Sequence, residues 1–137
     1  TLEGVDISSN MIEEAKKKGV YDKLSVADIM EIIDNYENDF DVIIAMDVLC
    51  FFGDLSEVYK KCARALRQGG VFGFTVEKDA SGQDWTFHNY GNFLHSSDYL
   101  KRMGKTFGFK EMKIEEMVLR KELYEARVGY LCIFQRI

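Results

Sequence analysis

Three aspartates in the first third of the chain each follow a short apolar segment. Asp6 ends the segment Leu-Glu-Gly-Val-Asp, Asp28 ends Leu-Ser-Val-Ala-Asp, and Asp47 follows the apolar segment Phe40–Met46. Short apolar segments of this kind predict β-strands. In open α/β sheets, ligands bind at the carboxyl ends of the strands. A carboxylate in that place can accept hydrogen bonds from both hydroxyls of a ribose, so the three aspartates predict a ligand site at one edge of a sheet.

Residues next to these aspartates would complete a site for adenosine. Asp28 could accept a hydrogen bond from the exocyclic amine of a purine, and Ile7, Met11 and Ile29 would supply apolar faces for the ring. Each aspartate taken alone is weak evidence, because Asp is also common in helix caps and turns. For Asp6 both interpretations, cap or turn and ligand, therefore stay open.

Strand and helix patterns alternate from residue 2 to residue 76. Strands are predicted over residues 2–6, 24–28, 40–46 and 71–76, with helices after the first strand, over 29–36 and from Leu55 to Leu66. This alternation predicts right-handed crossovers and a parallel sheet covered by helices on both faces. Gly69 and Gly70 are expected to form a tight turn before the fourth strand.

Capping residues mark the ends of these helices. Ser8, Ser9 and Asn10 can cap the first helix, Gly19 is a typical C′ residue, and Asp54 can cap the third helix. The basic run at residues 16–18 falls in the last turn of the first helix, where positive charge favours the helix dipole. We interpret this run as a solvated helix end rather than a binding patch.

The last third of the chain has a different pattern. Residues 78–95 form a polar and aromatic connection, and a helix capped by Ser96 or Ser97 follows and ends at Gly108. Two strands are then predicted over residues 109–119 and 128–134, joined by a charged loop at residues 120–125. Strands that follow each other without an intervening helix are expected to pair antiparallel.

Composition restricts the class of protein. A chain of 137 residues with 47% hydrophobic residues suits one folded domain, and a net charge of -5 argues against a nucleic-acid partner. The three cysteines, Cys50, Cys62 and Cys132, lie far apart in apolar segments, which predicts buried free thiols and no metal site. With no apolar stretch of membrane-spanning length and no signal peptide, we expect a cytoplasmic protein.

The order and spacing of four segments resemble the class I methyltransferases that use S-adenosylmethionine. The four segments are Gly-Val-Asp-Ile-Ser-Ser-Asn-Met at 4–11, Ala-Asp-Ile at 27–29, Phe-Asp-Val-Ile-Ile-Ala-Met-Asp-Val-Leu at 40–49, and Leu-Arg-Gln-Gly-Gly-Val-Phe at 66–72. The resemblance implies an α/β, Rossmann-like sheet. This sheet would be mostly parallel, with an antiparallel pair of strands at its C-terminal end.

The resemblance also implies roles for individual residues toward S-adenosylmethionine. Asp6 would bind the ribose hydroxyls, and Asp28 with the backbone of Ile29 would recognise the adenine. Ile7 and Met11 would pack on the base. The pair Met46 and Asp47 would lie near the methionine end of the cofactor.

One part of the family's pattern has no counterpart in this sequence. The first strand of the family and its glycine-rich turn come before residue 1, and that strand lies between the strands at 2–6 and 40–46. Without it the sheet would split and expose two strand edges. We therefore expect residues 1–137 to be a single, N-terminally truncated methyltransferase domain. The alternatives are direct pairing of the two strands or a second chain between them, and an exposed edge would favour a homodimer.

Four further segments resemble predicted methyltransferases that are often fused to tetratricopeptide-type repeats. They are Phe-Phe-Gly-Asp-Leu at 51–55, Thr-Val-Glu at 75–77, His-Ser-Ser-Asp-Tyr-Leu at 95–100 and Val-Leu-Arg at 118–120. The sequence itself contains no repeat of that kind.

The acceptor of a methyl group is expected beside residues 78–95, because this connection follows the carboxyl end of a strand. If the acceptor is a hydroxyl or ammonium group, His95 or Tyr90 could serve as the general base. A helix cap or a structural hydrogen bond is the alternative for His95, and a small apolar core is the alternative for the whole segment. The acceptor itself, a small molecule or a protein, is not specified.

Two other functions remain open at this point. One is a non-catalytic module that binds the cofactor or a partner. The other is a nicotinamide dehydrogenase, since an acid at the end of a strand also suits the ribose of NAD. The antiparallel final strand pair argues against the dehydrogenase.

Overall fold

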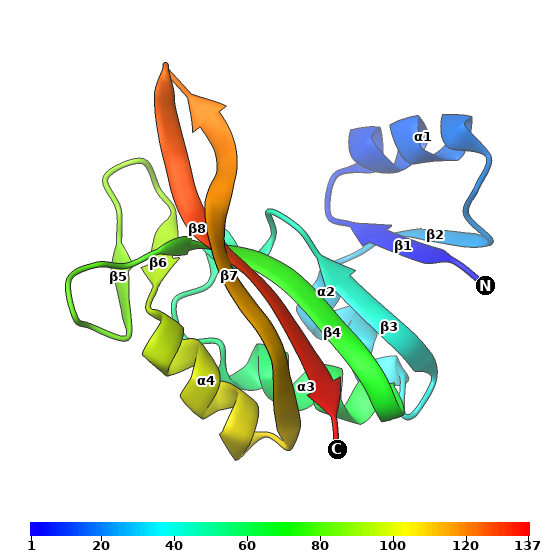
Figure 1. Ribbon diagram of the computed structural model, residues 1–137. Coiled ribbons are helices and arrows are strands. Elements are labelled where there is room, and N and C mark those ends of the chain that lie inside the picture. The colour runs from blue at the N-terminus through cyan, green and yellow to red at the C-terminus, as the bar shows by residue number, and fades with distance from the viewer. The chain divides into compact units, whose positions relative to one another are not determined.

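A computed structural model describes all residues from Thr1 to Ile137 (Figure 1). The chain divides into two compact units, an N-terminal unit, Thr1–Tyr36, and a C-terminal unit, Glu37–Ile137. The strands form two sheets, one with two strands and one with six. The predicted split of the sheet is thus confirmed, because β1 (Glu3–Asp6) pairs only with β2 (Lys23–Val26) and β3 (Phe40–Ala45) pairs only with β4 (Leu66–Lys78).

The N-terminal unit is a β-α-β segment followed by a short helix. Strands β1 and β2 are parallel, with helix α1 (Ser9–Lys18) between them. After β2 come helix α2 (Ile29–Ile32) and a 3₁₀ helix (Ile33–Asn35), which together replace the single helix predicted over 29–36.

The ends of α1 agree with the sequence analysis. The Ser8 hydroxyl accepts a hydrogen bond from the Met11 amide at 3.3 Å, and Gly19 ends the helix with a left-handed φ of 65°. In the last turn, Lys16 and Lys17 form ion pairs with glutamates one turn earlier, and all four side chains are exposed. The lysine run is therefore a solvated helix end, as predicted.

The C-terminal unit is a six-stranded sheet with helices on one face. In chain order its helices and strands are β3, a 3₁₀ helix (Leu49–Phe51), α3 (Ser56–Ala65), β4, β5 (Trp85–Phe87), β6 (Phe93–His95), α4 (Ser97–Thr106), β7 (Phe109–Glu122) and β8 (Glu125–Arg136). β3 lies parallel to one edge of β4, and β8 and β7 continue the sheet antiparallel beyond the other edge. This confirms the antiparallel pair at the C-terminal end. The six-stranded sheet is mixed rather than mostly parallel as expected, because only the β3–β4 and β4–β6 pairs are parallel, whereas β4–β8, β7–β8 and β5–β6 are antiparallel.

An aromatic cluster centred on Tyr59 of α3 forms the core of this unit. The Tyr59 ring lies with its edge toward Phe72, Phe74, Phe109 and Phe134 at centroid distances of 5.6–5.9 Å. Edge-to-face contacts of this kind add to the stabilisation that comes from burying apolar area. The cluster lies between the sheet and helices α3 and α4, which cover the same face (Figure 1).

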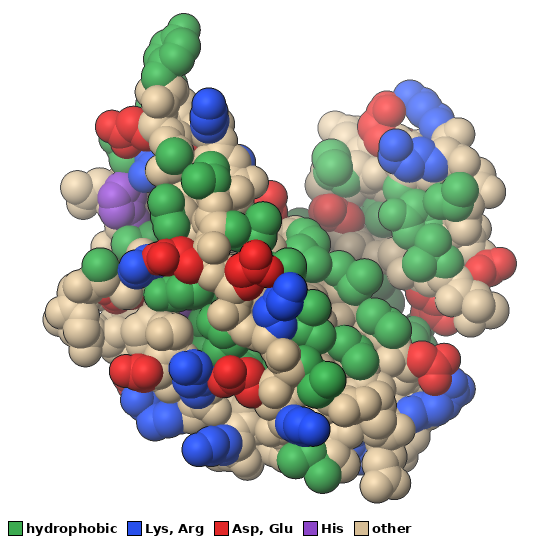
Figure 2. All heavy atoms as spheres, viewed as in Figure 1, with side chains coloured by type: hydrophobic (Ala, Val, Ile, Leu, Met, Phe, Trp, Pro, Cys, Tyr) green, Lys and Arg blue, Asp and Glu red, His purple; other side chains and the backbone are tan.

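The opposite face of this sheet is only partly covered. Val42 and Ile44 of β3 are 54% and 67% exposed, and hydrophobic side chains gather over β3 and β4 on the face that Figure 2 shows. Within the C-terminal unit, the expected helices on both faces are thus found on one face only.

Strand β4 begins earlier than predicted. It starts at Leu66, directly after α3, instead of after a tight turn at Gly69 and Gly70. The pairing with β3 is irregular here, because Phe40 pairs with Leu66 whereas Val42 pairs with Val71. The glycine turn is therefore a bulge inside β4, and Gly69 supplies the left-handed φ of 81° that it needs.

The predicted connection at 78–95 contains two strands that the sequence analysis missed. β5 and β6 form an antiparallel hairpin, and the end of β6 pairs in parallel with Glu77 and Lys78 of β4. These strands have three residues each, too few for a periodic pattern to be recognised.

The predicted charged loop at 120–125 is wrong. β7 and β8 remain paired as far as Glu122 and Glu125, so only Leu123 and Tyr124 form the turn, both with positive φ. The charged side chains on either side of this turn compensate one another, because Glu122 forms ion pairs with Arg120 and Arg127. The charge that suggested a loop instead forms ion pairs within β7, between Arg120 and Glu122, and across to β8, between Glu122 and Arg127.

Candidate functional site

Asp6 and Asp28 lie at the same end of the two-stranded sheet. The parallel register pairs Asp6 with Val26, and the Ala27 amide donates a hydrogen bond to the Asp6 carbonyl at 3.0 Å. Asp28 follows directly after Ala27. The structure therefore brings together two of the three predicted strand-end carboxylates, at the carboxyl end of β1 and β2.

Each of these carboxylates uses one oxygen in a local hydrogen bond. Asp6 Oδ1 accepts from the Ser8 amide at 2.8 Å, and Asp28 Oδ1 accepts from the Met30 amide at 2.8 Å as the N-cap of α2. The cap or turn interpretation is thus correct for both residues. It leaves the second oxygen of each carboxylate without a protein donor, so that capping does not prevent either from binding a ligand.

Apolar side chains are exposed beside the two carboxylates. Ile7 is 75% exposed, Met11 57% and Ile29 37%. Ile7 follows Asp6 directly, Ile29 follows Asp28, and Met11 lies in the first turn of α1. A few polar groups among exposed apolar side chains are what a binding site for an aromatic ring requires.

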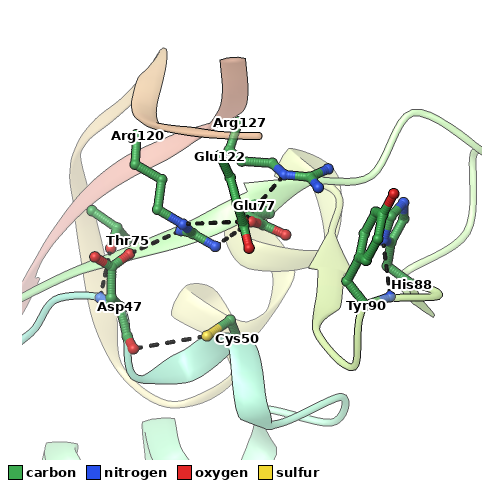
Figure 3. A network of polar contacts seen from close by, with 9 residues as sticks. All are labelled: Asp47, Cys50, Thr75, Glu77, His88, Tyr90, Arg120, Glu122 and Arg127. Carbon is green, nitrogen blue, oxygen red and sulfur yellow. Dashed lines mark hydrogen bonds and ion pairs between the residues drawn. The ribbon is translucent and has the colours of Figure 1, made fainter. Parts of the chain in front are cut away.

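The third predicted carboxylate, Asp47, lies in the C-terminal unit, in the connection between β3 and α3. Its backbone has a left-handed φ of 55°, which is uncommon for a residue other than glycine. The Asp47 amide donates to Thr75 Oγ1 at 3.1 Å, and Arg120 Nη1 donates to Asp47 Oδ1 at 3.2 Å (Figure 3). Met46 precedes it and is 45% exposed.

Arg120 is a site residue to which the sequence analysis gave no role. Its Nη2 donates to Glu77 Oε1 at 2.6 Å, and its Nε lies 3.7 Å from Glu122 Oε2. The Glu77 side chain is only 6% exposed, whereas the Asp47 side chain is 62% exposed. Arg120 therefore connects a buried carboxylate of the sheet to an exposed carboxylate at the predicted site.

His95 is buried and contacts the connection between β3 and α3 near its C-terminal end. His95 Nε2 lies 2.9 Å from the Gly53 carbonyl, and the side chain is fully buried. Because a carbonyl only accepts, Nε2 must carry the proton, and burial lowers the pKa of His95. This geometry favours the structural hydrogen bond over the general base.

Tyr99 holds the connection one turn further along the chain. Its hydroxyl accepts from the Leu55 amide at 2.8 Å and donates to Asp54 Oδ1 at 3.2 Å. Asp54 also accepts from the Ser56 amide at 2.8 Å, so it binds the first residue of α3, but the N-cap residue is Leu55 and the cap predicted at Asp54 is one residue too early.

The four segments at 51–55, 75–77, 95–100 and 118–120 therefore meet around a single connection. Gly53 contacts His95, Leu55 contacts Tyr99, and Glu77 contacts Arg120. The sequence showed these segments as separate matches, and the fold gives them a common position.

Tyr90, the other candidate base, lies on the surface in the loop between β5 and β6. It is 62% exposed, its ring lies 5.0 Å from the His88 ring, and the Arg127 guanidinium lies 4.9 Å from its ring centre (Figure 3). An exposed phenol in this place is accessible to an acceptor, in contrast to the buried His95.

The cysteines agree with the prediction of buried free thiols. Cys50, Cys62 and Cys132 are all free and buried, and burial raises the pKa of Cys62 and Cys132 to about 12. No group of three or more His, Cys, Asp or Glu side chains is arranged to hold a metal ion. None of the helices has the length and apolar character needed to cross a bilayer.

Comparison with known proteins points to one family. A family model described as a methyltransferase domain matches residues 1–74. The ubiquinone biosynthesis O-methyltransferase of Coxiella burnetii is 26% identical over 113 residues, which are 69% of this chain and 48% of that protein. The chain thus spans about half the length of this curated relative.

Solved structures share the fold. A methyltransferase from Methanosarcina mazei described as S-adenosylmethionine-dependent has a TM-score of 0.75 at 14% identity, over 98% of this chain and 81% of that chain. The 1,6-didemethyltoxoflavin-N1-methyltransferase of Burkholderia thailandensis has a TM-score of 0.77 at 12% identity, over 98% of this chain and 60% of that chain. The α/β, Rossmann-like fold predicted from the sequence is therefore confirmed.

The family match covers more than half of the chain, including both strand-end aspartates of the N-terminal unit and Asp47. It favours the methyltransferase over the nicotinamide dehydrogenase. This chain belongs to the methyltransferase domain family.

Proposed function

We propose that this protein binds S-adenosylmethionine and transfers its methyl group to a small-molecule acceptor. The observation that supports the proposal most strongly is the pairing of Asp6 and Asp28 at the carboxyl end of β1 and β2, beside exposed Ile7, Met11 and Ile29. Each carboxylate keeps one oxygen free of protein donors, and the apolar side chains are not used in a core. These residues suit an adenosine group.

Each residue contributes through its own chemistry. Asp6 would accept from the ribose hydroxyls, Asp28 and the Ile29 backbone would bind the adenine edge, and Ile7 and Met11 would pack on its faces. When bound, S-adenosylmethionine supplies an electrophilic methyl group on a sulfonium. Transfer occurs by in-line attack, so that positioning can supply much of the rate.

For the methionine part we propose the C-terminal unit. Asp47 would accept from the cofactor's amino group through the carboxylate oxygen that Arg120 does not bind, and Met46 would lie beside it. Tyr90 remains the proposed general base for an acceptor hydroxyl, since it is exposed.

The choice of a small molecule as acceptor follows from the relatives. The Coxiella burnetii relative is named for ubiquinone biosynthesis, and the Burkholderia thailandensis enzyme was solved with 1,6-didemethyltoxoflavin. A protein acceptor is the competing proposal. The narrower resemblance to methyltransferases fused to tetratricopeptide-type repeats does not decide between the two.

A module that binds the cofactor without catalysis is the second candidate. It is favoured by the burial of His95, whose Nε2 is already bound to the Gly53 carbonyl. Methyl transfer from S-adenosylmethionine to a phenolic acceptor by this protein would exclude the second candidate.

We further propose that β3 pairs with one more strand along the edge that β4 leaves free. Within the C-terminal unit β3 pairs only with β4, so the backbone donors and acceptors of its other edge are unpaired, which supports the proposal. Hydrogen exchange on residues 1–137 tests it. Amides of that edge that are as protected as those paired with β4 would support a further strand, and rapid exchange would exclude it.

Calorimetric titration with S-adenosylhomocysteine tests the binding proposal. Asp6→Asn should weaken binding about 10- to 100-fold, because hydrogen bonds to a charged group contribute about 1.5–3 kcal/mol. Asp22→Asn is a matched control, since Asp22 also accepts from a backbone amide, that of Leu2 at 2.6 Å, but precedes β2 at the amino end of the sheet. Equal affinities of the two variants, or no binding by the wild type, would refute the proposal.

A further inference from the structure

Arg120 lies where carboxylates from three parts of the C-terminal unit converge. It donates to Glu77 of β4 at 2.6 Å and to Asp47 at 3.2 Å, and Glu122 of β7 is 3.7 Å away. The two hydrogen bonds use different nitrogens, Nη2 for Glu77 and Nη1 for Asp47. The planar guanidinium can therefore connect both carboxylates at once, which an ammonium on a flexible chain does much less well.

Glu77 fixes the guanidinium in place. Its side chain is 6% exposed, whereas that of Arg120 is 30% exposed. A buried carboxylate without its partner would be strongly unfavourable, so this ion pair persists whether or not a ligand is present. The second nitrogen of Arg120 is thereby held toward Asp47 (Figure 3).

Asp47 needs such support because its backbone is strained. A left-handed φ of 55° at a residue other than glycine is unfavourable unless its surroundings maintain it. Three contacts maintain it. The Thr75 hydroxyl accepts a hydrogen bond from the Asp47 amide, the Cys50 thiol lies against the Asp47 carbonyl, and Arg120 donates to the Asp47 carboxylate. Arg120 is the one contact that orients the carboxylate itself.

We propose that Arg120 is a positioning residue that holds Asp47 for the amino group of the bound methionine. This inference rests on the proposed function, in which Asp47 binds the cofactor. Arg120 occupies Oδ1 and directs Oδ2 to the ligand, so that it acts through Asp47 and not by contact with the cofactor. Glu77 is the buried anchor of this arrangement.

The test compares two ligands that differ by the methionine part. In calorimetry on the full chain, Arg120→Gln should weaken S-adenosylhomocysteine at least about tenfold and leave adenosine affinity unchanged. Loss of structure in both units would weaken both ligands, and the urea midpoint of Arg120→Gln shows whether its C-terminal unit is still folded under the conditions of the titration. Arg67→Gln is the control, because Arg67 forms an exposed ion pair with Asp41 at 2.8 Å that has no part in this network.

Two more variants address folding and pathway. Arg120→Lys keeps the charge and should fold, with an affinity between those of wild type and Arg120→Gln. Asp47→Asn should weaken the binding of S-adenosylhomocysteine as Arg120→Gln does. The double variant should bind no more weakly than Asp47→Asn alone, because both substitutions remove the same interaction with the ligand. Additive losses would show that Arg120 does not act through Asp47.

The outcomes separate this inference from the proposed function. If wild type does not bind S-adenosylhomocysteine, the proposed function fails. If wild type binds and Arg120→Gln binds equally well, or loses adenosine to the same extent, the positioning role of Arg120 fails and the proposed function stands.

Discussion

Replacing Tyr99 by Phe should destabilise the C-terminal unit by about 2 kcal/mol. The Tyr99 hydroxyl is the acceptor for the Leu55 amide at 2.8 Å, and both residues are almost completely buried. Phe fills the same space without the oxygen, so the Leu55 amide would be left buried without an acceptor. An unsatisfied buried donor costs about 1–3 kcal/mol. Asp54 loses less, since it keeps its hydrogen bonds from Ser56 and is exposed.

Urea unfolding followed by circular dichroism would measure this loss. The midpoint should fall while the slope stays constant, because a lost hydrogen bond changes stability and not the surface exposed on unfolding. Tyr124→Phe is the control, since Tyr124 is fully exposed in the turn between β7 and β8 and should change stability by less than about 0.5 kcal/mol. A Tyr99→Phe variant as stable as this control would refute the reasoning.

Three other predictions concern buried groups. Burial lowers the pKa of His95, so the unfolded state takes up a proton first as the pH falls. The free energy of unfolding should therefore decline below about pH 6.5 by up to about 1.4 kcal/mol per pH unit. In urea unfolding, His95→Gln should remove this decline, and a variant whose midpoint falls with pH as steeply as that of the wild type would contradict the prediction. Gly129→Ala should lower the free energy of unfolding by about 3 kcal/mol in the same assay, because the added Cβ would collide with the Val76 carbonyl. Gly73→Ala is the control and should cost far less, since the nearest atom to its added Cβ is 3.9 Å away. Similar losses of stability in the two variants would refute the steric explanation. The three buried cysteines should react with a thiol reagent only after denaturant is added, and rapid labelling of the native protein would show that they are accessible.

The network at the β3–α3 connection gives a reason for the order of helices and strands after β4. Strand β6 pairs with the last residues of β4, and thereby brings His95 to the Gly53 carbonyl. The long hairpin of β7 and β8 brings Arg120 to Asp47 from the other edge of the sheet. Strands β6 and β7, which are distant in sequence, thus bind the two ends of the β3–α3 connection, β6 at Gly53 and β7 at Asp47.

Local patterns in the sequence determined much of this protein. The segments ending at Asp6 and Asp28 predicted two parallel strands with their acids at one edge, and the structure has them there. The cap at Ser8 and the stop at Gly19 were predicted for the same reason, since they depend on hydrogen bonds and backbone angles within a few residues. The split of the sheet was predicted from the family resemblance, because the family's first strand has no counterpart in this sequence.

What only the tertiary structure decided are the contacts between residues distant in sequence. Arg120 and Glu77 are 43 positions apart, and Tyr99 and Leu55 are 44 apart, so no local pattern pairs them. The residue type of His95 makes it a candidate base, whereas its burial against Gly53 depends on where β6 joins the sheet. The sequence predicts which residues can do chemistry, whereas burial and pairing across strands decide which of them are used for structure and which remain free for a ligand.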